Sequence, residues 1–339
     1  MVLSESEYAH FVGRVYGDDQ SGYTISNTAS GIEFATDSRN VYITLSGSQA
    51  PEGDVYVNVL IDNERVKRME IGSQEKEYSL YVNRDQKVHT VKVLKATEAQ
   101  YSSLVLYAVR GDGYFYPVTE KSQRKIAFYG DSITCGYGNI GDSSVKTYRT
   151  QDQDGTQTYA YFCADKLHAE IDVLAATAWS VNKSKWSSTT RIPDVFDCYS
   201  PIDTRKYLSE PDEETDFVVV NLGTNDATYY TQASAADKKL NFEDPYYEFY
   251  KKLRSKYPNA KIILALGMMG QNSGAKVLEL LEENVQNVVQ RAQFDGDDDI
   301  SYCRLYTASM PSDMGTNGHP SVAAHKKAGE QLYAHINAQ

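Results

Sequence analysis

Three short segments, far apart along the chain, carry the residue types that an ester-cleaving site needs. A serine hydroxyl becomes a good nucleophile only when a base lies within hydrogen-bond reach. Ser132 and His319 could form such a pair, because an imidazole with an ordinary pKa of about 6.5 can be neutral and still accept a proton at physiological pH. The side-chain amide of Asn225 could stabilise the negative charge that forms on the carbonyl oxygen in the transition state. The three segments are Gly130-Asp-Ser-Ile-Thr134, Gly223-Thr-Asn-Asp226 and Gly318-His-Pro-Ser321.

Each of these residues also has an ordinary structural explanation. Ser132 could cap a helix after a strand, Asn225 could form an Asx turn, and His319 could pack near the start of a helix. Asp131 is better explained as an acceptor for backbone N–H groups of its turn than as a catalytic acid, and Asp226 as a cap for the segment that follows it. The prediction of an ester-cleaving site therefore depends on the joint occurrence of the serine, the amide and the histidine.

The elements that must position these residues are strands of a parallel sheet. The segments that contain Ser132 and Asn225 each follow directly on an apolar, β-branched run, and open α/β sheets place their chemistry at the carboxyl ends of such strands. Helical periodicity lies between the runs, clearest over 275–291 and after His319. This alternation predicts a doubly wound parallel sheet. The five strand-like runs are 125–129, 171–175, 217–222, 262–266 and 300–306.

The first third of the chain has a different pattern. Short runs alternate apolar and polar residues with period two, are separated by turn residues, and include no convincing helix. Such regularly spaced strands indicate a β-sandwich, and we expect a jelly roll. The polar stretch 119–124 is the best boundary, so we predict a sandwich domain over residues 1–120 and the parallel-sheet domain over 121–339. The clearest runs are 31–35, 41–45, 55–60, 78–81 and 89–93.

Composition limits the partners of this chain. It has 339 residues, 41% hydrophobic and 24% charged, with a formal net charge of -12. That charge disfavours nucleic acids and anionic membrane surfaces, which need clustered Lys and Arg, and leaves small neutral substrates open. The four cysteines form no CxxC pair, so we expect reduced, mostly buried thiols, and no spacing predicts a metal site or another cofactor. Oligomeric state stays open, and a homo-oligomer is allowed.

The amino-terminal sequence lacks the basic start and apolar core of a secretory signal. No apolar stretch approaches the roughly 20 residues that span a bilayer. We therefore expect either a cytoplasmic protein or a secreted one whose signal is missing from this sequence.

The longer segments around the three motifs resemble the SGNH (GDSL-type) hydrolase superfamily. Residues 125–138, 220–226 and 318–325, behind a β-sandwich, look like carbohydrate esterase family 2, and 88–93 fits that family too. The resemblance covers nearly the whole chain. It implies a jelly roll beside an SGNH hydrolase domain, and the metal-free removal of acetyl groups from xylan, mannan and related oligosaccharides.

Two departures from the superfamily pattern affect the expected site. The position three residues before the histidine, where an Asp is common, is Thr316. The resemblance therefore implies a Ser–His dyad in which a backbone carbonyl orients His319, with Asp313 or Asn317 as alternatives. The superfamily glycine whose N–H faces the oxyanion matches Val181 in the stretch 178–182. The expected oxyanion donors are then the N–H groups of Ser132 and Val181 with the Asn225 amide.

Substrate choice is less constrained by the sequence. Trp179 and Trp186 follow the second predicted strand of the parallel sheet, near the expected cleft, and one of them could stack on a sugar ring. The leading hypothesis is a serine esterase that deacetylates plant cell-wall polysaccharides or oligosaccharides through an acetyl-serine intermediate. The alternatives are a lipase or thioesterase on the same scaffold, and a catalytically inactive carbohydrate-binding protein.

Overall fold

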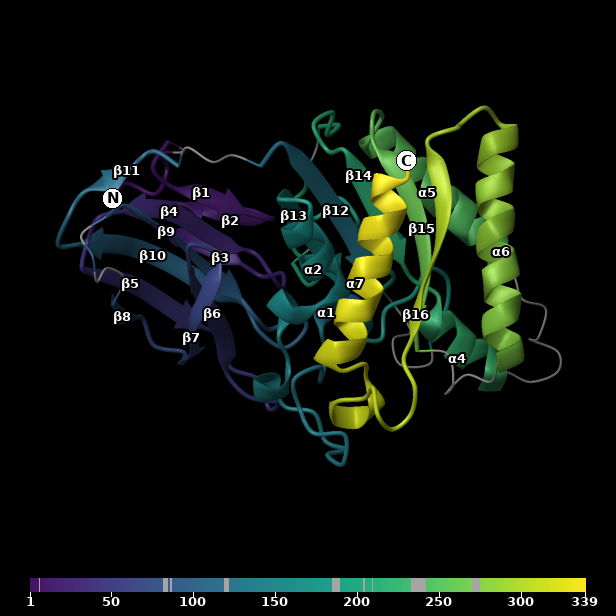
Figure 1. Ribbon diagram of the computed structural model, residues 1–339, viewed down its shortest axis with the longest axis horizontal. Coiled ribbons are helices and arrows are strands. Elements are labelled where there is room, and N and C mark those ends of the chain that lie inside the picture. Colours follow the sequence, from purple (N-terminus) through teal and green to yellow (C-terminus); the bar gives the residue numbers. More distant parts are fainter. Residues whose placement is uncertain are drawn as a thin grey trace.

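A computed structural model shows an antiparallel β-sandwich followed by a parallel sheet flanked by helices (Figure 1). The architecture predicted from the sequence, a β-sandwich followed by a doubly wound parallel-sheet domain, is confirmed. The predicted domain boundary falls at 119–121, outside the described residues, so the exact bounds stay a prediction. The structure describes all residues except 6, 82–84, 86, 119–121, 185–189, 204, 209, 233–241 and 270–274.

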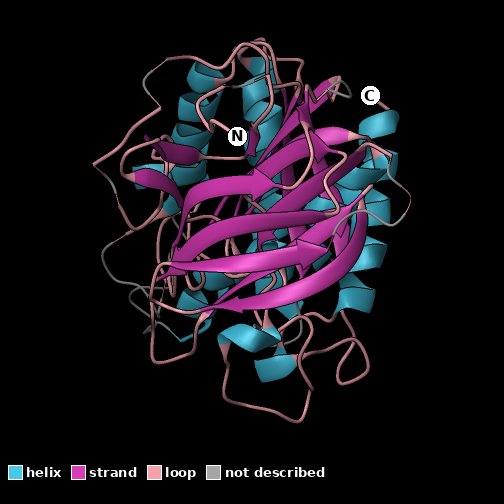
Figure 2. Ribbon diagram, turned by 90° about the vertical axis from the view of Figure 1, so that its left-hand side faces the viewer, coloured by secondary structure: helices cyan, strands magenta, loops and turns pink. Residues whose placement is uncertain are grey.

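The sandwich consists of two antiparallel sheets, seen in front of the helices in Figure 2. The first sheet has the order β1 (His10–Val12), β4 (Gly31–Thr36), β9 (His89–Lys95), β6 (Val55–Ile61) and β7 (Glu64–Ile71), with β11 (Phe115–Tyr116) also paired to β4. The second has the order β2 (Val15–Asp18), β3 (Gly22–Ile25), β10 (Leu104–Gly111), β5 (Asn40–Gly47) and β8 (Lys76–Tyr81).

The period-two pattern explains how the sandwich closes. In β5, Val41, Ile43 and Leu45 are buried in the core between the sheets, whereas the residues between them are half-buried. Side chains alternate between the two faces of a strand, so this spacing sends every apolar residue to one side. The five strand runs predicted for this part of the chain all lie in strands of the structure.

The second part is a five-stranded parallel sheet with helices on both faces. Its strand order is β13 (Ala169–Ala175), β12 (Arg124–Gly130), β14 (Phe217–Asn221), β15 (Lys261–Met268) and β16 (Ile300–Thr307). Helices α2 (Tyr159–Lys166) and α7 (Val322–Asn337) pack on one face, and α5 (Glu243–Lys256) and α6 (Ala275–Phe294) pack on the other. The short helices are α1 (Ser132–Cys135), α3 (Ile192–Val195) and α4 (Thr224–Gln232), with 3-10 turns η1 (Thr150–Asp152), η2 (Gly155–Gln157) and η4 (Thr316–Gly318).

Register brings the loops that follow three strands to one edge of this sheet. Gly130 at the end of β12 pairs with Ala175 at the end of β13 and with Asn221 at the end of β14. The segments that start beyond these residues contain Ser132, the 176–182 stretch and Asn225. The five predicted strands and both predicted helices of this domain are confirmed.

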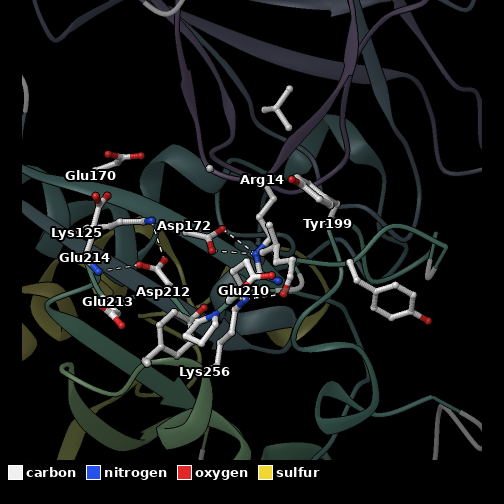
Figure 3. Close-up of a pocket in the computed structure, with 16 residues that line it drawn as sticks. Arg14, Lys125, Glu170, Asp172, Tyr199, Glu210, Asp212, Glu213, Glu214 and Lys256 are labelled. Carbon is white, nitrogen blue, oxygen red and sulfur yellow. Dashed lines mark hydrogen bonds and ion pairs between the residues drawn. The ribbon is translucent and has the colours of Figure 1, made fainter.

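One arginine ties the sandwich to the parallel sheet. Arg14, between β1 and β2, is 4% exposed, and its Nε donates to both oxygens of Asp172 in β13 at 3.1 and 2.9 Å. Its Nη1 donates to the carbonyls of Phe196 and Cys198 at 2.8 and 2.7 Å, and its Nη2 donates to the Tyr129 hydroxyl at 2.8 Å. Figure 3 shows the guanidinium reaching Asp172. A buried charge with all its nitrogens bonded holds the two domains in one arrangement.

Two further predictions concern residue environments. All four cysteines are free and buried, as expected. Within the described part of the chain, no helix combines the length and apolar character that crossing a membrane requires.

Candidate active site

Ser132 lies at the turn between β12 and α1. The Asp131 carboxylate accepts the Ile133 N–H at 3.0 Å and caps the helix, as predicted. A Cβ on Gly130 would lie 2.0 Å from the Thr134 hydroxyl, so only glycine lets the strand turn this tightly. The serine is 7% exposed and stands at the start of the helix.

His319 approaches Ser132 from the other end of the sequence. Its Nε2 lies 3.0 Å from the Ser132 hydroxyl oxygen, across 187 residues of chain. Its Nδ1 lies 3.3 Å from the backbone carbonyl of Asn317, and its ring packs on Tyr137 with centroids 4.4 Å apart. If Nδ1 carries the proton and donates to that carbonyl, Nε2 is free to accept from the serine. The geometry is that of a nucleophile, a base and a group that orients the base.

The surroundings of His319 keep the imidazole neutral. Burial lowers the pKa of His319 to about 4, and the hydrogen bond to the Asn317 carbonyl opposes this shift only in part. Desolvation disfavours the charged form of a base, so the ring is an acceptor over nearly the whole physiological range. A neutral imidazole is the form that can take a proton from Ser132.

No carboxylate among the described residues orients His319. Thr316 is fully buried, and its N–H donates to the Gly138 carbonyl at 2.9 Å. Asp313 accepts from the Tyr306 hydroxyl at 2.6 Å and from the Ser309 N–H at 3.1 Å, so its carboxylate is used elsewhere. The expected backbone carbonyl is therefore that of Asn317, and the Asp313 alternative is not supported.

Asn225 lies beside the serine turn, in the first turn of α4. Its Nδ2 donates to the Trp179 carbonyl at 2.8 Å and lies 3.3 Å from the Asp131 carboxylate. The amide group has two protons. The first bond fixes the orientation of the group, and the second is long enough for a substrate oxygen to replace it. Burial raises the pKa of Asp131 to about 7, so part of this carboxyl group is protonated near neutral pH, and the protonated oxygen accepts less well from the amide.

The prediction for Val181 conflicts with the geometry. Its N–H donates to the Asp226 carboxylate at 3.1 Å, and the N–H groups of Asn182 and Lys183 donate to the same carboxylate at 2.9 Å each. The Val181 N–H is one of three N–H groups bonded to this buried carboxylate, at a shorter distance than the 3.3 Å contact between the Asn225 amide and Asp131, so it is less available to an oxyanion. The reason is that Asp226, 45 residues away, folds back over this loop. Asp226 thus caps residues 181–183 rather than the segment after it.

Another residue of the same loop has the properties that Val181 lacks. Ala178 has φ +71°, a left-handed conformation that favours glycine, and it is half-buried. No described residue accepts its N–H, and the same is true of the N–H of Ser132. Its neighbour Trp179 offers the carbonyl that holds the Asn225 amide, so this loop lies at the serine turn.

The tryptophan predictions have different outcomes. Trp179 is only 6% exposed and packs in the hydrophobic core with Tyr129, Leu174 and Tyr230. Its ring therefore offers no open face for a sugar, and the prediction that it stacks on substrate conflicts with this burial. Trp186 lies outside the described residues, so its role stays a prediction.

Sequence reasoning missed other features of the site. The turn that presents the Asn317 carbonyl did have a sequence signal, the pair Asn317-Gly318. Asn and Gly tolerate a left-handed backbone better than most residues, and these two have φ of +55° and +69°. No local signal marked Tyr137 as the wall of His319. His325 is fully buried behind the site, and its Nδ1 accepts the Tyr159 N–H at 3.1 Å.

A cavity lies away from these residues. It has a volume of about 770 Å³ and is lined by Lys125 and Glu170, at the amino-terminal edge of the parallel sheet (Figure 3). The three cations among its described lining residues already have partners: Lys125 contacts Asp212 at 2.8 Å, Lys256 donates to the Leu208 carbonyl at 2.5 Å, and Arg14 is saturated as described above. Ser132 stands at the opposite, carboxyl edge, so this cavity is not the site of the serine and histidine. Among the described residues, no cluster of His, Cys, Asp and Glu could hold a metal ion.

Comparison with known proteins supports the same reading of the chain. Residues 128–327 match the profile described as the GDSL-like lipase/acylhydrolase family, and residues 11–117 match the carbohydrate esterase 2 N-terminal profile. A protein named cellulase/esterase CelE, from Acetivibrio thermocellus, is 26% identical over 337 residues, which are 96% of this chain and 38% of that protein. The chain therefore spans well under half of that relative.

Two further similarities cover almost complete chains. A protein named acetylxylan esterase / glucomannan deacetylase, from Cellvibrio japonicus, is 21% identical over 340 residues, 98% of this chain and 88% of that protein. The structure of a family two carbohydrate esterase from Clostridium thermocellum, in complex with cellohexaose, has a TM-score of 0.87 at 24% identity, covering 97% of this chain and 98% of the other. At that identity the likeness shows the fold.

Proposed function

Because the chain belongs to the GDSL-like lipase/acylhydrolase family and carries the N-terminal domain of carbohydrate esterase family 2, we propose that it removes O-acetyl groups from plant cell-wall polysaccharides or oligosaccharides. The observation that carries the proposal is the 3.0 Å contact between the Ser132 hydroxyl and the His319 Nε2. The names of the relatives, an acetylxylan esterase / glucomannan deacetylase among them, favour acetylated xylan and glucomannan as substrates.

The chemistry proceeds in two steps. The Ser132 oxygen attacks the acetyl carbonyl carbon while its proton moves to Nε2 of His319, and that proton then passes to the departing sugar oxygen. Water next attacks the acetyl-serine, gives a proton to His319, and releases acetate as the proton returns to Ser132. The Asn317 carbonyl holds the Nδ1 proton through both steps and steadies the imidazolium.

Three donors stabilise the negative charge in this mechanism. They are the N–H of Ser132, the N–H of Ala178 and the side-chain amide of Asn225. Ala178 takes the place predicted for Val181, because its N–H is unpaired among the described residues whereas the N–H of Val181 is bound to Asp226. Donors fixed in advance at the position of the developing oxyanion supply much of the rate enhancement in acyl transfer.

Replacement of the nucleophile tests the proposal. Ser132→Ala should reduce acetate release by on the order of 10⁴-fold or more, because the remaining donors cannot replace a nucleophile. Release of acetate from acetylated xylan and glucomannan oligosaccharides, followed by NMR, measures this. Val181→Ala serves as a matched control that shortens a side chain in the neighbouring loop and should retain most of the activity. Near wild-type turnover by Ser132→Ala would refute the assignment.

The same assay separates the rival hypotheses. A lipase or thioesterase would prefer 4-nitrophenyl butyrate or longer esters to the acetate, whereas a sugar deacetylase should prefer acetate. An inactive carbohydrate-binding protein would bind oligosaccharides without acetate release. For polymeric wall substrates, the proposal carries with it the prediction that the protein is secreted.

A further inference from the structure

A carboxylate from the sandwich reaches the loop of Ala178, whose N–H has no acceptor among the described residues. Glu98 lies between β9 and β10 of the sandwich and is fully buried. Its two oxygens accept from the preceding residue of that loop, Thr177, at 2.8 Å from the N–H and at 2.5 Å from the hydroxyl. The chain separation is 79 residues, so this contact exists only because the two domains pack together.

The same region of the sandwich also touches the serine helix. The Sγ of Cys135, the last residue of α1, lies 3.6 Å from the Glu98 carboxylate. Gln153 donates from Nε2 to the Cys135 carbonyl at 2.9 Å and accepts the Glu98 N–H at 3.3 Å. One residue of the sandwich therefore contacts the loop of Ala178 and is linked to the helix that begins with Ser132.

The backbone at Ala178 needs such support. An alanine in the left-handed region is strained, and strained conformations persist only where the surrounding structure determines them. The two bonds from Thr177 fix the 176–177 peptide and the Thr177 side chain, just before the strained residue. The bond from Asn225 to the Trp179 carbonyl fixes the chain just after it, so the backbone at Ala178 is held from both sides.

Keeping a charged group here is costly for the fold. Desolvation raises the pKa of Glu98 and lowers the pKa of the neighbouring Lys95, also fully buried, to about 7. The Lys95 ammonium is held by the carbonyls of Thr97 and Glu98 at 2.7 and 3.0 Å. Burying a charged group costs stability unless hydrogen bonds compensate for its lost hydration. The stability of the fold therefore does not explain why a carboxylate, that of Glu98, is buried at this position.

We propose that Glu98 is a positioning residue: it holds Thr177 so that the N–H of Ala178 points at the oxyanion formed on attack by Ser132. The inference rests on the proposed esterase function and adds to it a specific part for the sandwich. The sandwich then completes the catalytic site, in addition to packing beside it. A donor displaced by a fraction of an ångström stabilises the transition state less, while the ground state of a bound substrate is little affected.

The test removes one of the two bonds with little change in shape. Thr177→Val deletes the hydroxyl, and Thr177→Ser keeps it. With 4-nitrophenyl acetate, kcat of Thr177→Val should fall by about tenfold or more while KM stays within about twofold, because a displaced donor acts on the transition state. Thr177→Ser should stay within about threefold of wild type. Glu98→Gln, which weakens the acceptor from the sandwich side, should lower kcat in the same way.

Controls separate positioning from stability. Thr36→Val makes the same change at a fully buried threonine of β4 whose hydroxyl donates to the Tyr114 carbonyl at 2.7 Å, remote from Ser132. It should lower the melting temperature and leave kcat unchanged. The acidic limb of the pH profile should not move in Thr177→Val, since His319 is untouched.

Three results would overturn the inference: an unchanged kcat in Thr177→Val, a loss that tracks the unfolded fraction, or an equal loss in Thr177→Ser. If the wild-type chain itself releases no acetate, the proposed function is wrong, and the inference fails with it. If the wild-type chain is active and one of the three results above is found, only the inference about Glu98 is wrong.

Discussion

The lowered pKa of His319 leads to a prediction about pH. If this ring is the base, the neutral form is the active one, and activity is lost as pH falls through the pKa of the free enzyme. Burial lowers that pKa to about 4. At pH 5 about 90% of the imidazole is then neutral, against about 3% for an ordinary histidine with a pKa of about 6.5. The value of kcat/KM at pH 5 should therefore be close to its plateau at pH 8.

The measurement is kcat/KM for acetate release between pH 3.5 and 8, which reports groups of the free enzyme. The folded fraction must be measured at each pH by circular dichroism. The pKa of His319 is lower in the folded chain than in the unfolded chain, so the unfolded chain binds a proton first as pH falls below about 6.5, and stability decreases from there to about pH 4.

Neighbouring carboxyls call for a control. Burial raises the pKa of Asp131 to about 7 and the pKa of Asp226 to about 6. Protonation of either carboxylate could therefore lower kcat/KM at a higher pH than protonation of His319 does, which would add a second acidic limb. In Asp131→Asn and Asp226→Asn variants such a limb disappears, whereas the limb of His319 persists near pH 4. An acidic limb centred at pH 6 or above in all three proteins, with the chain folded, would refute the reasoning about His319.

Three other substitutions test separate parts of the structure. Asn225→Ala should lower kcat by about 10²–10³-fold with little change in KM, as measured with 4-nitrophenyl acetate, and an effect confined to KM would contradict an oxyanion role. Arg14→Met leaves Asp172 buried without its partner and should cost about 3–5 kcal/mol in urea unfolding; a loss below 1 kcal/mol would show that this contact does not hold the domains together. Ala178→Gly relieves the left-handed strain and should raise the free energy of unfolding by about 0.5–1 kcal/mol with kcat within about threefold; a lower stability would contradict the strain argument.

Local patterns were sufficient for the elements and for three site residues. Strand β5 and helix α6 follow from periodicities of two and 3.6 residues, because burial on one face imposes these spacings directly on the sequence. The turn at Ser132 requires a glycine at position 130, because a Cβ there would clash with Thr134. This requirement also involves only residues that are close in sequence. For the same reason, the serine, amide and histidine segments could be recognised without coordinates.

The predictions that failed were about which groups are already bonded. Whether the N–H of Val181 or of Ala178 is free depends on Asp226, and no pattern within the loop reveals where that carboxylate lies. Whether Trp179 faces a sugar or the core depends on helices that pack against it from elsewhere in the chain.

The amino-acid sequence by itself determined the order of strands and helices, the type of sheet in each half, and the three residues that could perform acyl transfer. Tertiary structure decided that Ser132 and His319 are 3.0 Å apart, that the Asn317 carbonyl orients the ring, and that Glu98 of the sandwich supports the loop of Ala178. The physical reason is that hydrogen-bond partners and burial are set by contacts between distant segments, whereas periodicity and turn chemistry act between neighbours.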